Sequence, residues 1–206
     1  GAMLKALVVN PPSQYNLPPN RVNLKNLNAR TQLHNTFEQP EVQRNVDLDL
    51  AILHFYHQEL SKLEWHLEQQ AKQHDPTSLS VLRTIPGVGR ILALTILYEI
   101  GDIERFESVQ KFASYARLIK CKAESAGKSY GTQGNKIGNA HLKWAFSEAA
   151  VLFLRNNDKA QRYLQKLQRR MNKAKALSAL AHKLGRATYF MLKHRRVFDE
   201  QRFLTG

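Results

Sequence analysis

The sequence has one cysteine, no long apolar run and, over forty residues of its second half, no carboxylate. A single thiol, Cys121, excludes an internal disulfide framework and is typical of proteins from reducing compartments. No apolar run approaches the ~20 residues that a membrane-spanning helix needs, and the N-terminus lacks the pattern of a signal peptide. With 43% hydrophobic and 23% charged residues, the composition is that of a globular, cytoplasmic protein.

The missing carboxylates leave the second half strongly basic. Residues 1–100 hold nine Lys/Arg and nine Asp/Glu, so the net charge of +14 lies entirely after residue 100. Between Lys159 and Phe198 there are twelve Lys/Arg and no Asp or Glu. A solvated helix face normally mixes both signs, so this stretch predicts a polyanionic partner, with nucleic acid favoured over a membrane surface. The apolar residues of the stretch have the spacing of core positions rather than of a lipid-facing helix.

Three regions follow one another along the chain. Residues 1–20 are interpreted as a tag remnant, Gly1-Ala2-Met3, and an irregular, proline-rich lead-in. Residues 21–75 are expected to be a helical, coiled-coil dimerisation region with helices at 21–37 and 41–74. Asp75-Pro76-Thr77 ends the long helix, and Thr77 or Ser78 is expected to cap the next one. Residues 76–206 are expected to form the compact domain, so the predicted fold class is mainly α.

The long helix shows near-heptad spacing of apolar residues, which is typical of a coiled coil. The alternative is one long helix that packs on its own domain. A histidine in this seam is interpreted as a packing feature rather than a ligand. The seam consists of Val46, Leu50, Leu53, His57, Leu60, Leu63 or Glu64, and Leu67.

The compact domain is expected to be a succession of short helices around one glycine-rich interruption. Four glycines between residues 119 and 138 are too many for a helix, so this segment is predicted to be a loop or a short hairpin. The helices are expected at 78–85, at 88–100 with Gly101 as its C-cap, from the N-cap Ser108 to Leu118, and at 139–155, 159–172 and 176–197.

The first motif with a physical function is a Pro-Gly-x-Gly turn between two apolar segments, Leu82 to Ala93. This is the helix-hairpin-helix pattern, in which glycines permit a tight turn and the second helix presents unpaired amides to a phosphate. Such contacts hold a duplex without reading its sequence. The alternative is a turn used only for packing. The DNA-binding residues predicted here are Gly87, Val88, Gly89 and Arg90.

The second motif is a serine in a small-residue loop surrounded by cations. Ser125 has Lys120, Lys122 and Lys128 nearby in the sequence, and Glu124 could orient or accept a proton. A serine that attacks a phosphodiester needs an uncrowded loop and cations for the developing charge. On composition alone, an ordinary loop explains these residues better than a nucleophile does.

No metal site is predicted in this sequence. Its eight histidines are scattered without ligand spacing, and Asp102 and Glu104 fit solvated helix ends better than a metal site.

Four blocks together resemble the C-terminal domain of the insertion-sequence-110 transposase family, which is related to the pilin-gene invertases. The resemblance spans roughly residues 78–157, and the order and spacing of its blocks are more specific than any block alone. The blocks are Leu82–Gly89, Phe106–Leu118, Ala123–Lys128 and Lys136–Lys143.

The resemblance implies a bacterial, nucleoid-associated recombinase. Its members have an N-terminal ribonuclease-H-like domain with four metal-binding carboxylates, for which Mg²⁺ is expected, and a C-terminal serine that forms a phosphoserine link to DNA. Several act with a guide RNA and assemble as dimers or tetramers. Ser125 matches the family's serine best, although Glu124 and Ala126 depart from its Ser and Gly, which leaves Ser129 as a fallback.

The sequence therefore predicts the DNA-binding, serine-bearing part of a transposase. It is expected to lack the metal-dependent domain, to bind nucleic acid and not to recombine it alone. A non-catalytic helix-hairpin-helix scaffold for DNA or RNA is the alternative. The further DNA-binding residues predicted are Lys136, Lys143, Arg162, Lys166, Arg169, Arg170 and Lys173.

Overall fold

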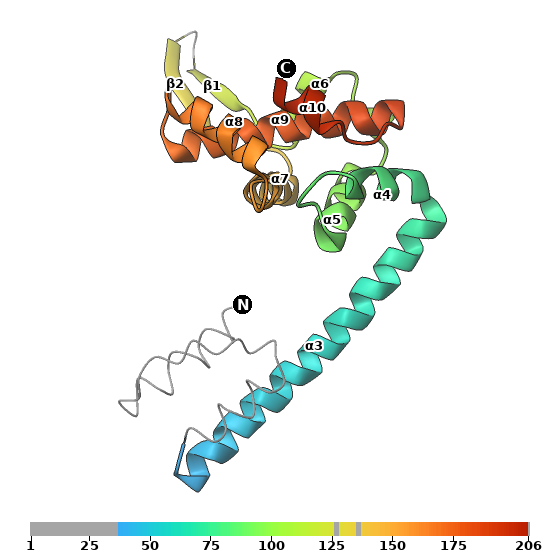
Figure 1. The fold of residues 1–206 in the computed structure, drawn as a ribbon, viewed down its shortest axis with the longest axis vertical. Helices are drawn as coiled ribbons and strands as arrows, with labels where there is room; N and C mark the ends of the chain where they lie inside the picture. The colour runs from blue at the N-terminus through green and yellow to red at the C-terminus, as the bar shows by residue number, and fades with distance from the viewer. Residues whose placement is uncertain (1–36, 126–127, 135–136, 206) are drawn as a thin grey trace. The chain divides into compact units, whose positions relative to one another are not determined.

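The computed structural model describes residues 37–125, 128–134 and 137–205, with residues 120–134 described by their backbone (Figure 1). The expected lead-in and the first expected helix, up to residue 36, lie outside the described residues. The elements are α3 (Pro40–His74), α4 (Pro76–Arg83), α5 (Arg90–Ile100), a 3₁₀ turn η1 (Ile103–Arg105), α6 (Val109–Tyr115), β1 (Lys120–Ser125), β2 (Lys128–Gly134), α7 (Ala140–Phe153), α8 (Asp158–Gln168), α9 (Lys173–His194) and α10 (Glu200–Thr205). The mainly α class is confirmed for the described residues.

The chain forms two units, residues 1–65 and 66–206. The long predicted helix is confirmed as α3, which contains the boundary between the units. The second unit therefore begins inside α3, whereas the predicted domain boundary is at residue 76. A physical reason is Ala71, which is only 1% exposed and belongs to the core of the second unit.

Within the first unit, α3 has two apolar faces. The early seam residues Val46 and Leu53 are buried, but from His57 on the predicted seam is exposed. A neighbouring face is exposed over most of its length, and its members follow the three- and four-residue steps that place side chains on one side of a helix. These exposed residues are Leu48, Ile52, Phe55 and Tyr56, together with Leu60 and Leu63, which also belong to the predicted seam.

The α4 helix begins differently from the prediction. Neither Thr77 nor Ser78 caps it; the carboxylate of Asp75 accepts a hydrogen bond from the Ser78 amide at 2.9 Å. The reason is Pro76, which suits the first helical position because its missing N–H would have no partner there. The cap therefore moves to the residue before the proline.

Two predicted helix ends are confirmed, while others are shifted: α5 begins at Arg90 rather than 88, α8 ends at Gln168 rather than 172, and α9 spans Lys173–His194 rather than 176–197. Ser108 caps α6 and Gly101 ends α5 with φ +63°, as predicted. Asparagine side chains cap three later helices, which matches their preference for accepting first-turn amides. The caps are Asn139 for α7, Asn157 for α8 and Asn172 for α9. The turn η1 and the short α10 were not predicted.

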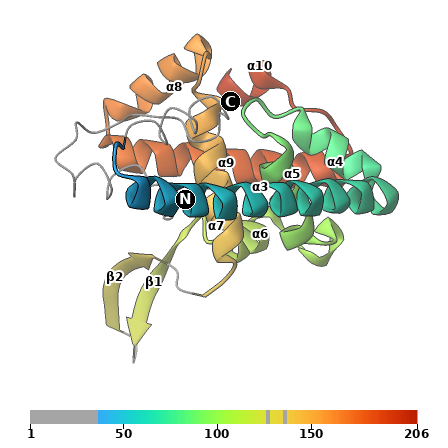
Figure 2. The same cartoon turned by 90° about the horizontal axis from the view of Figure 1, so that it is seen from below.

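The core of the second unit forms around α7 and α9. Figure 2 shows α9 running through this unit, with α8 and α10 above it in this view. Edge-to-face contacts join Phe112 to Phe146 and Phe153 to Phe203, an arrangement that aromatic rings prefer over stacking face to face. The largest fully buried side chains are Phe112, Phe146, Phe153, Leu82, Ile96, Ile100, Leu142, Leu180, Leu184 and Thr188.

The glycine-rich segment is a hairpin, one of the two forms predicted for it. Strands β1 and β2 pair antiparallel, with Lys120 opposite Gly134 and Ser125 opposite Lys128. An irregularity between Lys122 and Glu124 shifts the register, which is the signature of a β-bulge.

Candidate nucleic-acid interface

The turn between α4 and α5 uses its first glycine for packing. Gly87 has φ +84°, and a Cβ there would lie 2.6 Å from the Leu152 carbonyl carbon and 2.7 Å from the Phe153 nitrogen. Only glycine allows both this backbone and this approach to α7. Val88 is buried and its amide donates to the Ile85 carbonyl. At Gly87 and Val88, the structure therefore gives the turn a packing role.

The second glycine of the turn has open space around it. A Cβ on Gly89 would meet nothing within 4 Å, and Gly89 is the N-cap of α5 without any side-chain hydrogen bond to the first turn. Gly89, Arg90 and Ile91 are all exposed. The start of α5 is thus an accessible helix N-terminus, the geometry that favours an anion.

Cations beside this turn are held by one carboxylate. Glu68 lies 3.2 Å from Lys72, 3.3 Å from Arg83 and 3.8 Å from Arg90, and its side chain is only 12% exposed. Through these ion pairs Glu68 connects α3 to both arginines of the turn. Glu68 orients both arginines at the edge of the turn and was not predicted as part of the site.

Exposed lysines and arginines follow one another along α8 and the start of α9. Ala160 and Leu164 are the buried residues of α8, and its lysines and arginines face solvent. Apart from Asp158 at the first turn, no carboxylate interrupts the surface. We call this the α8 surface; it comprises Lys159, Arg162, Lys166, Arg169, Arg170, Lys173 and Lys175.

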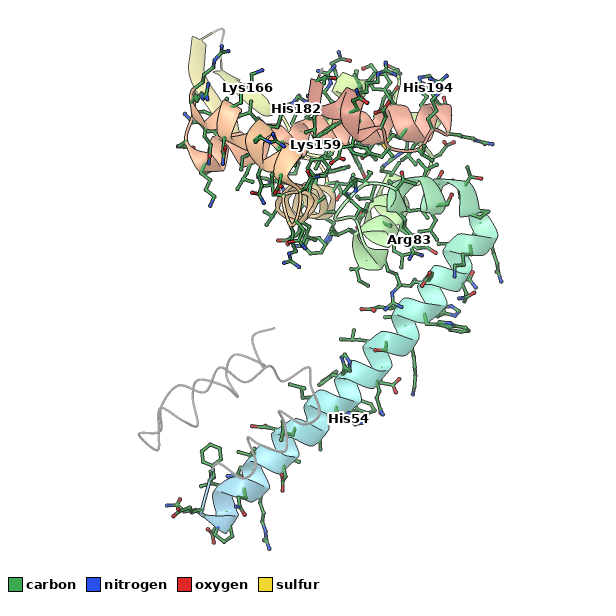
Figure 3. All side chains as sticks on the ribbon, viewed as in Figure 1. His54, Arg83, Lys159, Lys166, His182 and His194 are labelled. Atoms are coloured by element: carbon green, nitrogen blue, oxygen red, sulfur yellow. The ribbon has the colours of Figure 1, made fainter. Side chains whose placement is uncertain are left out.

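Within the described part of the chain, none of these seven cations has an ion-pair partner. Figure 3 shows Lys159 and Lys166 on α8 at one end of the unit. Lys143 is also exposed, on α7. The predicted cations of α8 and of the start of α9 are therefore all exposed and free of ion pairs within the described part of the chain, while Lys136 lies outside it.

Both candidate serines belong to the tip of the hairpin. Ser125 ends β1 opposite Lys128, and Ser129 pairs with Glu124. Lys120 and Lys122 lie on the same strand, nearer to its base. The backbone thus brings the two serines, a carboxylate residue and a lysine residue to one end of a two-stranded sheet.

The base of the hairpin is fixed by a polar cluster that sequence reasoning missed. Asn139 donates from its amide nitrogen to Glu99 at 2.6 Å and to the Tyr115 hydroxyl at 3.4 Å, while its backbone amide donates to the Tyr115 carbonyl at 2.7 Å. Gly138, with φ +116°, leaves no room for a Cβ against that carbonyl. The hydrogen bond to Asn139, and then one from Arg105, lowers the pKa of Tyr115.

The described residues offer no ligand set for a metal ion. No three His, Cys, Asp or Glu side chains gather among them where they could share one. In the same described part, no helix combines the length and apolarity needed to cross a membrane.

Comparison with known proteins gives one family and several distant relatives. Residues 79–165 match the family described as Transposase IS116/IS110/IS902 family. The "Pilin gene-inverting protein" of Moraxella bovis is 27% identical over 128 residues, 59% of this chain and 39% of its own length.

Two insertion-element proteins are similar over comparable stretches. The "Transposase for insertion sequence element IS1111A" of Coxiella burnetii is 26% identical over 121 residues, 57% of this chain and 33% of its own length. The "Insertion element IS110 uncharacterized 43.6 kDa protein" of Streptomyces coelicolor is 31% identical over 152 residues, 73% of this chain and 36% of its own length. The chain thus spans 33% to 39% of these three relatives.

Proposed function

Because residues 79–165 form a domain of the IS116/IS110/IS902 transposase family, we propose that this chain is the DNA-holding, serine-bearing part of a site-specific recombinase. The observation that supports this most is the α8 surface, whose seven exposed cations lack carboxylate partners among the described residues. Such a surface matches the regular phosphate charge of a duplex. The accessible start of α5, flanked by Arg83 and Arg90, supplies a second contact to the backbone.

Ser125 is the proposed nucleophile, with Ser129 as the fallback. The serine oxygen forms a bond to phosphorus, one bridging P–O bond breaks, and the released sugar oxygen takes up a proton as a hydroxyl. Attack by a sugar hydroxyl of another strand end reverses the step and rejoins the DNA. Serine needs no high-energy cofactor for this exchange, since a phosphodiester is formed for each one broken. The lysines of the hairpin would stabilise the charge that develops on the phosphate.

The test is to trap the covalent link in the whole recombinase. Whole protein with nicked target DNA should yield a phosphoserine peptide by mass spectrometry, carried by Ser125. The Ser125→Ala variant should lose both the adduct and strand exchange, whereas Ser129→Ala should keep both. The reverse result would assign the role of nucleophile to the fallback, Ser129. Two results together would contradict this proposal: strand exchange by the Ser125→Ala variant and no adduct on the wild type. They would favour the alternative, a non-catalytic scaffold that binds DNA or RNA.

We also propose that α3 joins two copies of the chain. Its exposed face holds Ile52, Phe55 and Leu63, each more than a third exposed, and large apolar side chains in a continuous helical row are characteristic of helix–helix contacts. The family resemblance adds three further proposals. The whole recombinase would act with a guide RNA and Mg²⁺, and it would be a bacterial, cytoplasmic protein associated with the nucleoid.

A further inference from the structure

A cleft of about 900 Å³ lies where α9 ends and α10 begins. Its walls come from the last two turns of α9, from residues 195–199 and from α10. Its volume falls within the range of small-molecule sites in proteins. All of its residues lie after position 186, so they are outside the segment that matches the transposase family.

The wall of the cleft is cationic. Arg195, Arg196 and Arg202 line it together with His194, and none of the three arginines makes an ion pair with the residues that the structure describes. Asp199 is the one carboxylate of the lining, and its oxygen accepts the Arg202 amide at 2.9 Å as the cap of α10. The cleft therefore keeps a clear positive balance suited to an anionic ligand.

An aromatic ring stands beside these charges. Phe190 is 44% exposed, and the His194 ring lies parallel to it with 7° between the planes and 6.2 Å between the centroids. Behind this edge, Met191 and Phe203 are each 6% exposed and form an apolar floor. An exposed flat ring next to unpaired guanidinium groups is the combination that binds bases and phosphates of an unpaired strand.

The backbone of the cleft is strained where a charge is presented. Arg195 has φ 52° and ψ 43°, a left-handed conformation that a helix end usually gives to glycine. Its amide donates to the Leu192 carbonyl, and that of Arg196 donates to Met191. These hydrogen bonds are those of a Schellman helix end, and they hold Arg195 in the left-handed conformation.

The far wall is anchored to another part of the unit. The Phe198 amide donates to the Thr84 hydroxyl at 2.9 Å, across 114 residues of sequence. The Phe198 ring packs against Phe153 and Phe203 with centroids 5.9 and 5.1 Å away. The segment that carries Arg195 and Arg196 is thus fixed in place on both sides, which preorganises the cleft.

We propose that this cleft binds an unpaired nucleotide of a single strand, with its base stacked on Phe190 and its phosphates paired with Arg195, Arg196 and Arg202. Guanidinium groups recognise phosphate oxygens through paired hydrogen bonds. The exposed ring of Phe190 favours a nucleotide over an acidic peptide, because a base stacks on it and a carboxylate side chain does not. The site shares no lining residue with the α8 surface, and Figure 3 shows Lys166 toward one end of α9 and His194 toward the other. It does not depend on Ser125 being a nucleophile.

The experiment is fluorescence anisotropy with the full chain and four labelled probes. These are short oligothymidylate, oligouridylate of equal length, an abasic strand with the same phosphates, and a duplex. The variants are Phe190→Ala and Arg195→Gly, with Lys111→Gln on α6 as a control that removes one exposed cation elsewhere. Arg195→Gly also relieves the left-handed strain, so its melting temperature should not fall, and a loss of binding cannot be ascribed to misfolding.

Both cleft variants should weaken oligothymidylate or oligouridylate binding by about five-fold or more, the range of a lost stacking contact. Duplex binding should stay within about two-fold of wild type, because it depends on the α8 surface. The wild type should bind the abasic strand more weakly than either intact strand, and the better of the two intact strands identifies DNA or RNA. Equal losses for single strand and duplex, no loss at all, or displacement by polyglutamate at equal charge would each overturn the proposal.

Discussion

At the scale of single residues, Gly87 and Gly89 differ in what surrounds the Cβ that each lacks. Gly87→Ala combines a left-handed φ with a clash against the backbone of α7, and we expect it to lower the free energy of unfolding by roughly 2–4 kcal/mol. Gly89→Ala meets open space and should change it by less than about 1 kcal/mol. Urea denaturation followed by circular dichroism measures both, and equal losses would contradict the packing role of Gly87.

Gly89 also gives a test of backbone binding. Gly89→Val adds a branched side chain at the exposed start of α5 and should weaken binding to duplexes of every sequence about equally, because a phosphate contact carries no base information. Anisotropy with several unrelated duplexes measures this effect. A loss confined to one target sequence would show that the turn reads bases instead.

Thr188 offers a stability test of a different kind. Its hydroxyl is fully buried and has no hydrogen-bond partner among the residues that the structure describes, which is costly inside a protein. Thr188→Val replaces that hydroxyl by a methyl group of similar shape and should raise the free energy of unfolding by about 1 kcal/mol. Thr188→Ser keeps the hydroxyl and loses a methyl group, so it should be less stable than wild type. A destabilised valine variant would mean that the hydroxyl is satisfied in solution.

His182 should make stability depend on pH. Its burial in α9, and then the charge of Arg186, lowers the pKa of His182 below 6.5. The unfolded chain therefore takes up the proton first, so the stability associated with the neutral ring is present above about pH 6.5 and is lost as the pH falls through the lower, folded pKa. The melting temperature of wild type should fall more steeply than that of His182→Gln over this window. Parallel curves would contradict the shift.

At the scale of the elements, α3 allows a direct test of pairing between chains. Ile52→Lys combined with Leu63→Lys places two charges on the exposed apolar face and should convert a dimer into a monomer in light scattering, while the helix content stays unchanged. Gln58→Lys, at an exposed position away from that face, is the control and should remain dimeric. A wild type that is monomeric at high concentration would reject the pairing.

Helix ends could be predicted from the sequence where a single capping residue determines them. Ser108 and Gly101 fix helix ends through a side-chain hydrogen bond and a positive φ, so they were found in the sequence. The cap at Asp75 was missed because Pro76 fits inside the helix as well as before it. The cleft between α9 and α10 could not be predicted from the sequence. Its wall depends on the hydrogen bond between Phe198 and Thr84, and no local sequence pattern indicates a contact between residues so far apart in the chain.

At the scale of the whole molecule, the asymmetry of charge decides how DNA binding responds to salt. If the seven cations of the α8 surface all contact phosphates, the logarithm of the binding constant should fall with the logarithm of salt concentration at a slope of about −6. Arg162→Gln combined with Lys166→Gln removes two contacts and should make that slope shallower by about 2. Lys111→Gln lies on α6 outside this surface and should leave it unchanged.

This titration also separates the two nucleic-acid sites of the second unit. The α8 surface should control the slope for duplexes, whereas Phe190→Ala removes no charge and should lower single-strand affinity at every salt concentration without altering the slope. If the double variant Arg162→Gln, Lys166→Gln had the same salt slope for duplex binding as the wild type, the duplex would bind elsewhere and the proposed interface would be contradicted. Because counterion release depends on the number of phosphates contacted, the two slopes measure the size of each site independently of any assumption about the serine.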